Sequence, residues 1–176
     1  MKTFNAAPSA GSHIKTLGKI GYNLNTAISD IIDNSISAES SNIRISFDHV
    51  KRIITILDDG YGMERDELKQ NMVIGCKDPS DVREKNDLGR FGSGMKTASF
   101  SVADKLTVIS KTKSTPLSAF QWDVQKVIET DDWCLSELNN TDISNINNQL
   151  NENDQSGTEL ILDNIKRYKD IKRKIY

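Results

Sequence analysis

The chain has 176 residues, of which 27% are charged and 36% are hydrophobic, with a formal net charge of −2 at pH 7. This length suffices for one domain with a developed core, and the composition is globular rather than disordered. The nearly balanced charge provides no global attraction to nucleic acid or to an anionic membrane, and so it indicates neither partner for this segment.

The N-terminal part of the sequence carries no targeting signal. No apolar run approaches the length of a membrane span or of a signal-peptide core, so we expect a cytoplasmic protein with no membrane partner. Residues 1–12 are small and polar and contain Pro8 and Gly11, which predicts a flexible arm. Cys76 and Cys134 lie far apart in the sequence, and we expect both to be free thiols.

The first strongly patterned segment is Leu24–Ser37, where apolar residues recur at helical spacing and predict an amphipathic helix. Two β-rich runs, residues 42–48 and 51–59, are joined by a short polar turn and predict an antiparallel hairpin. Residues 63–74 predict a second helix, because acidic residues occupy its first turn.

The middle of the chain contains a long segment without periodicity, residues 75–93, which is rich in charge and glycine. Segments of this length inside a domain are lids, binding loops or disordered regions. Residues 94–102 then predict a helix. Three strands are expected after it, at 105–112, at 117–124 and, with a weaker pattern, at 126–133.

Near the C-terminus, residues 139–156 are dominated by Asn, Asp and Ser, and we interpret them as a solvated loop. Residues 157–162 predict a last strand, and the basic tail that follows is compatible with a helix. This order of elements predicts an α+β fold, a two-layer sandwich with helices on one face of a mixed, mostly antiparallel sheet.

Asp30 and Asn34 lie four residues apart in the first predicted helix, so both project from one face, with Asp33 beside them. An amide oxygen can ligate Mg²⁺ when phosphates supply most of the other ligands. A carboxylate can take a proton from a water that attacks phosphorus. The alternative is that these residues only solvate the edge of a helix, and the pattern alone does not decide between the two.

Asp58, Gly60, Gly62 and Met63 end the second predicted strand. The glycines let the backbone approach a flat ligand, since no Cβ intervenes. A carboxylate there can accept a hydrogen bond from the amino group of adenine, and a methionine offers the base an adaptable apolar surface. A simple turn between a strand and a helix explains the same residues equally well.

Gly89, Gly92 and Gly94 precede a predicted helix, and backbone N–H groups at such a position can turn toward a phosphate. Lys96 in the first turn would add a positive charge. The pattern is not a Walker A loop, because Met95 stands where that motif has its lysine and no buried strand precedes it. A flexible, glycine-rich entrance to a helix remains the alternative.

In this order the three motifs resemble the Bergerat ATP-binding fold of the GHKL ATPases, the group of gyrase, heat-shock chaperones, histidine kinases and MutL. The match is dense from Ala27 to Ser99 and looks most like the MORC-type and heat-shock-chaperone-type ATPases. Gly157 and Thr158 are similar to a later Gly-Thr signature of the family.

The resemblance implies that ATP and Mg²⁺ are the ligands, with Asn34 on the metal and Asp58 on the adenine amino group. It also implies a base pocket shaped by Gly60, Gly62 and Met63 and supported by Thr158, and an ATP lid at about residues 75–94. The residues it places near the phosphates are Gly89, Gly92, Ser93, Gly94, Met95 and Lys96.

Many members of the group carry glutamate where this chain has Asp30, whose side chain is one methylene shorter. A misplacement of about 1 Å costs on the order of 100-fold in rate. We expect Asp30 to be the general base of ATP hydrolysis, with Asp33 as the lesser candidate. The alternatives are a nucleotide-binding switch that does not hydrolyse, a histidine-kinase catalytic domain, for which no phospho-acceptor helix is evident, and a structural module.

The expected organisation is a GHKL ATP-binding domain over residues 13–165, with 166–176 beginning a connection to a downstream domain. The resemblance implies a nucleotide-dependent homodimer of the full-length protein, in which the N-terminal arm crosses to the partner. A nucleic-acid or client-protein partner would be bound through the downstream domains.

Overall fold

The computed structural model describes residues 2–4, 6–19, 23–74, 94–146, 148–151 and 155–166. Its strands are β1 (Ile43–Asp48), β2 (Ile53–Asp58), β3 (Lys105–Lys111), β4 (Ser118–Asp123), β5 (Leu135–Leu138) and β6 (Gly157–Asp163). Its helices are α1 (Ala10–Leu17), α2 (Leu24–Ser37), α3 (Arg65–Met72), α4 (Gly94–Val102), α5 (Val124–Thr130) and α6 (Asn140–Asn145).

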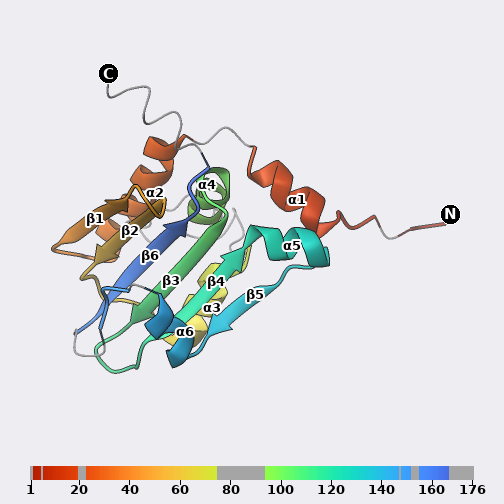
Figure 1. Ribbon diagram of the computed structural model, residues 1–176. Helices are drawn as coiled ribbons and strands as arrows, with labels where there is room; N and C mark the ends of the chain where they lie inside the picture. The colour runs from red at the N-terminus through yellow and green to blue at the C-terminus, as the bar shows by residue number, and fades with distance from the viewer. Residues whose placement is uncertain are drawn as a thin grey trace, which may run out of the picture.

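The six described strands form one open sheet in the order β1-β2-β6-β3-β4-β5 (Figure 1). β6, the last strand in sequence, lies between β2 and β3, so it joins the N-terminal hairpin to the rest of the sheet. The predicted α+β sandwich is confirmed. We expected a mixed sheet, whereas every described strand pairing is antiparallel.

The main core lies between the sheet and helices α1–α5. Alternate strand residues point into it, as the two-residue period of a strand requires, namely Ile54, Ile56, Leu106, Val108, Phe120, Trp122, Leu160 and Leu162. A smaller cluster contains Ile109 and Ile161 from the intervening positions together with Ile143 of α6. The expectation that all helices lie on one face is therefore wrong for α6, which packs against the opposite side of the sheet.

Helix α2 forms where the sequence predicts it. Asn23 caps it by accepting a hydrogen bond from the Thr26 N–H at 2.9 Å. Ala27, Ile31 and Ser35 are buried at successive intervals of four residues, so one stripe of the helix faces the core. The predicted β1–β2 hairpin, the helices α3 and α4 and the strands β3, β4 and β6 are confirmed as well, within a few residues at each end.

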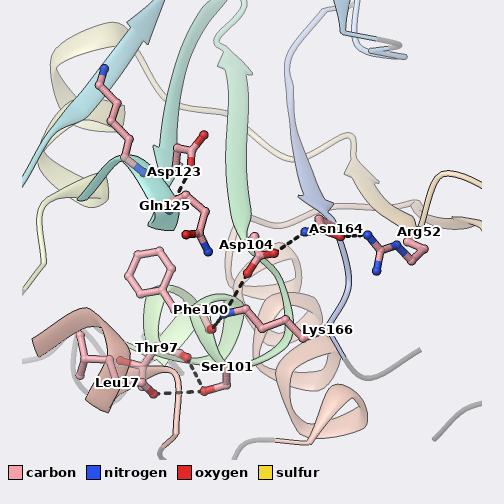
Figure 2. Close-up of polar contacts among 11 residues, drawn as sticks. Leu17, Arg52, Thr97, Phe100, Ser101, Asp104, Asp123, Gln125, Asn164 and Lys166 are labelled. Atoms are coloured by element: carbon pink, nitrogen blue, oxygen red, sulfur yellow. Dashed lines mark hydrogen bonds and ion pairs between the residues drawn. The ribbon is translucent and has the colours of Figure 1, made fainter. Parts of the chain in front are cut away.

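The prediction of a strand at 126–133 is wrong, because α5 occupies most of that segment. Asp123 accepts hydrogen bonds from the N–H groups of Gln125 and Lys126 at 3.0 and 3.3 Å, which starts a helix (Figure 2). Val124 and Val127 are both buried, and their spacing of three residues is helical. The β-branched residues of this segment therefore pack as one face of a helix.

The loop expected at 139–156 is only partly correct. Asn139 and Asp142 form a reciprocal capping box that starts α6, and Ile143 and Leu150 are buried. The short strand β5, which pairs with β4, is not predicted by the sequence. Two of the polar residues that suggested a solvated loop, Asn139 and Asp142, cap a helix here.

The N-terminal arm expected over residues 1–12 overlaps α1, which begins at Ala10. Asp131 accepts hydrogen bonds from the Ser9 hydroxyl at 2.6 Å and from the Gly11 N–H at 2.8 Å, which holds the start of α1 against the end of α5. Most of the predicted lid, residues 75–93, and the tail from residue 167 lie outside the described residues.

The end of β6 is fastened to α4 by a polar network (Figure 2). The Lys166 ammonium donates to the Phe100 carbonyl at 2.7 Å and lies 3.4 Å from the Asp104 carboxylate. Asn164 donates to Asp104 through its amide nitrogen and accepts from Arg52 through its amide oxygen. A cation thus lies at the carbonyl end of α4, where the helix dipole is negative.

None of the described helices is long and apolar enough to span a bilayer.

Candidate nucleotide-binding site

A row of three polar residues crosses neighbouring strands at one end of the sheet. Asp58 of β2 is opposite Thr158 of β6, which is in turn opposite Ser110 of β3. Residues directly opposite one another project from the same face. Two residues further along, the same face carries the apolar residues of the main core, so the polar row, Asp58–Thr158–Ser110, forms one edge of an otherwise apolar surface.

The Asp58 carboxylate is buried, with 7% of the residue exposed, and it is satisfied by donors on either side. The Ser35 hydroxyl donates to Oδ2 at 2.8 Å, and the Gly60 N–H donates to Oδ1 at 3.0 Å. Burial raises the pKa of the Asp58 carboxyl above its ordinary value, and these two hydrogen bonds, together with one from the Thr158 backbone N–H, oppose that rise. The two oxygens offer about four lone pairs, so one remains for a ligand.

Helix α2 carries the predicted catalytic and metal-binding residues next to this carboxylate. Ser35, which bonds Asp58, immediately follows Asn34 in the chain, so the amide and the polar row are held in a fixed relation. Asn34 is exposed and Asp30 is half-buried. Burial raises the pKa of the Asp30 carboxyl, and the charge of Asp33 raises it further. A raised pKa makes a carboxylate a better proton acceptor near neutral pH.

The turn after β2 requires glycine at position 62. Gly62 has a φ of +67°, and a Cβ at this position would lie 1.8 Å from the carbonyl oxygen of Lys111. The turn is therefore pressed against the end of β3, and any side chain at Gly62 would separate the two. The next residue, Met63, donates its N–H to the Ser110 hydroxyl at 2.9 Å.

The Gly-Thr pair at the start of β6 meets the same residues. Gly157 has a φ of +154°, and a Cβ there would lie 2.3 Å from the carbonyl oxygen of Asp58. The Ser110 hydroxyl donates to the Gly157 carbonyl at 2.9 Å and lies 2.8 Å from the Thr158 hydroxyl. Three segments that are far apart in sequence, the turn after β2, the end of β3 and the start of β6, thus meet at the polar row.

The predicted phosphate neighbours are only partly described. Gly89, Gly92 and Ser93 lie outside the described residues, and Gly94 begins α4. Lys96 is buried, with 1% of the residue exposed, and its ammonium donates to two carbonyls at the end of α3, those of Asn71 and Val73, at 2.6 and 2.7 Å. Met95 packs against the main core. The phosphate-binding roles of these residues stay predictions.

The described residues suit a metal that takes few protein ligands. They contain no group of three or more histidine, cysteine, aspartate or glutamate side chains that could enclose an ion. Asn34 presents an exposed amide on the helix face that also bears Asp30. Magnesium ions at nucleotides take one or two protein oxygens and complete their octahedron with phosphates and water. Asn34 therefore fits Mg²⁺ that arrives with a nucleotide.

Comparison with known protein families identifies the class of this domain. Residues 22–158 match the family described as histidine kinase-, DNA gyrase B- and HSP90-like ATPase. This match covers most of the chain and includes both Asp58 and Thr158. The chain belongs to this GHKL-type family of ATPases, whose members bind ATP.

Relatives of this chain among curated proteins include several named chaperone protein HtpG. The chaperone protein HtpG of Oceanobacillus iheyensis is 29% identical over 161 residues, which cover 81% of this chain and 25% of HtpG. HtpG of Clostridium botulinum is 36% identical over 103 residues, covering 53% of this chain and 16% of the relative. HtpG of Bacillus subtilis is 34% identical over 93 residues, which cover 48% of this chain and 14% of the relative. The chain thus spans a quarter or less of the length of these relatives.

Two residues of the site, Ser35 and Ser110, were not predicted from the sequence. Both interrupt an apolar pattern at an inward-facing position, since Ser35 continues the buried stripe of α2 and Ser110 follows Leu106 and Val108 along β3. A hydroxyl at an inward-facing position needs a buried partner. That interruption is the signal that could have identified them.

We predict that Ser35→Ala destabilises the domain by about 1–3 kcal/mol, because the buried Asp58 carboxylate loses a donor that nothing replaces. Ser37→Ala is the matched control on the same helix, since its hydroxyl donates to the Asp33 carbonyl outside the core. The control should change the free energy of unfolding by less than about 0.5 kcal/mol. Urea denaturation at pH 7 measures both, and equal losses would show that the Ser35–Asp58 bond contributes nothing specific.

Proposed function

We propose that this domain binds ATP together with Mg²⁺ and hydrolyses it to ADP and phosphate. The observation that carries the proposal is the bond between Ser35 and Asp58. It joins the polar row to the helix that bears Asp30 and Asn34. The purine end and the reacting end of a nucleotide would therefore be positioned by directly connected elements.

On the purine side, the ionised carboxylate of Asp58 would accept a hydrogen bond from the adenine amino group. The carboxylate suits this role because it is buried, accepts hydrogen bonds from Ser35 and Gly60, and keeps a lone pair for the ligand. The turn through Gly62 and Met63 brings backbone close to the same edge of the sheet, where it would contact a flat base. Thr158, opposite Asp58, would support the base from the other side of that carboxylate.

On the phosphate side, the Asn34 amide would hold the Mg²⁺ that accompanies the nucleotide. The metal would neutralise part of the negative charge of the phosphates. Asp30 would take a proton from the attacking water, and the elevated pKa of its carboxyl suits that task. The N-terminus of α4, with the glycine motif before it, would face the phosphates. The side chain of Asp30 is shorter than the family's usual glutamate, so slow hydrolysis is the expected outcome.

In the full-length protein, we propose that nucleotide binding closes the segment of about residues 75–94 over the ATP and promotes a homodimer. The domain would extend over residues 13–165, with 166–176 leading to a downstream domain. In this setting the downstream part would decide which client protein or nucleic acid is acted on. We propose a cytoplasmic location for the domain.

Asp58→Ala should weaken ATP binding about 10- to 100-fold, since a hydrogen bond to a buried charge is lost. Isothermal titration with ATP and Mg²⁺ measures the dissociation constant. Asp66→Ala, which removes an exposed carboxylate from α3, is the control and should bind like the parent. If Asp58→Ala binds ATP as tightly as the parent, the purine site lies elsewhere.

Asp30→Asn should lower the turnover of ATP by about 100-fold or more while leaving its dissociation constant within a few-fold, because a general base acts on the water and not on the nucleotide. Asp66→Asn, which neutralises an exposed carboxylate on α3, is the control and should retain most of the activity. Steady-state phosphate release by the full-length protein gives the rates. Equal rates for Asp30→Asn and the parent would favour a nucleotide-binding switch, and phosphate transfer to a partner histidine would favour a kinase.

A further inference from the structure

Ser110 makes three close polar contacts from a fully buried position. Its hydroxyl oxygen lies 2.9 Å from the Met63 nitrogen, 2.9 Å from the Gly157 carbonyl oxygen and 2.8 Å from the Thr158 hydroxyl oxygen. The residue is 0% exposed, so water does not compete for these contacts. Ser110 therefore connects the turn after β2, the start of β6 and the end of β3.

The three contacts determine where the hydroxyl protons point. The Met63 N–H can only donate, so the Ser110 oxygen accepts from it, and the Gly157 carbonyl can only accept, so it takes the single Ser110 proton. Because the Ser110 proton is used for Gly157, the hydrogen bond between the Ser110 and Thr158 hydroxyls must use the proton of Thr158. Only one assignment satisfies all three contacts, and in it the Thr158 hydroxyl donates to Ser110.

This assignment fixes what Thr158 can offer to a ligand. Its one proton is committed to the buried serine, so toward the partly exposed side it presents lone pairs alone. Asp58, directly opposite in the register, also presents lone pairs when ionised. The accessible part of the polar row thus accepts hydrogen bonds and donates none.

We infer that Ser110 is a specificity-determining positioning residue: by orienting the Thr158 hydroxyl, it makes the site select a purine with a 6-amino group over one with a 6-oxo group. The amino group of adenine donates to acceptors, whereas a 6-oxo group would face them with a further acceptor. A site whose buried polar groups are left without partners rejects a ligand strongly. The inference rests on the proposed function, and it explains why the nucleotide site would select adenine.

ATP and inosine triphosphate test it, because they differ only in the amino or oxo group at position 6 and in the proton that inosine carries on N1. We expect Ser110→Ala to lower the preference for ATP over inosine triphosphate by about fivefold to tenfold, since the Thr158 hydroxyl can then rotate and donate into the site. Ser118→Ala, which removes the hydroxyl opposite Ser110 on β4, is the matched control and should leave the preference unchanged. Titration calorimetry with each triphosphate and Mg²⁺ gives the ratio.

A double-mutant cycle separates orientation from simple packing. Thr158→Val removes the hydroxyl at nearly constant shape, so it should itself lower the preference, and adding Ser110→Ala should lower it no further. If Ser110→Ala weakens both triphosphates equally, or if Thr158→Val alone leaves the ratio unchanged, the inference is wrong. The second outcome decides the matter even if Ser110→Ala does not fold.

Asp58→Ala distinguishes a failure of this inference from a failure of the proposed function. Loss of ATP binding in Asp58→Ala, with an unchanged ratio in Ser110→Ala, would overturn the role of Ser110 and leave the nucleotide site in place. Unchanged ATP binding in Asp58→Ala would overturn the proposed function and the inference together.

Discussion

The buried carboxylate of Asp58 requires hydrogen-bond donors, and the structure around it provides them. A charge removed from water without partners costs several kcal/mol, so the hydrogen bonds from Ser35 and the backbone of Gly60 stabilise the fold around it. The first contact joins the sheet to α2, and the second fixes the turn that leaves β2. The position of α2 over the sheet, and with it the positions of Asp30 and Asn34, is fixed by the Ser35–Asp58 contact together with the buried stripe of Ala27 and Ile31.

The surrounding elements hold the same geometry from further away. Lys96, near the start of α4, binds the carbonyls at the end of α3, and Lys166 binds the Phe100 carbonyl in the last turn of α4. Helix α4 is thus fixed near both ends by buried or half-buried ammonium groups. A site needs such support because small displacements of its groups cost much of their effect. Its N-terminal glycine motif would then meet a nucleotide from a rigid helix.

The spacing of apolar residues predicted the long elements well. In α2 and β3, for example, inward-facing residues recur several times at helical or strand spacing. The prediction failed at α5, where β-branched residues suggested a strand and one side chain, Asp123, caps a helix instead. The motifs and the family resemblance predicted site roles for Asp58 and Thr158. They could not identify Ser110, because its role depends on which residues the sheet register places opposite one another.

The most direct measurement is a crystal structure of the domain with Mg²⁺ and a non-hydrolysable ATP analogue. The structure presented here predicts the adenine amino group within hydrogen-bond distance of the Asp58 carboxylate, with the Ser35 contact retained and the metal at the Asn34 amide. A nucleotide bound elsewhere, with no contact to the Asp58 carboxylate, would contradict the account.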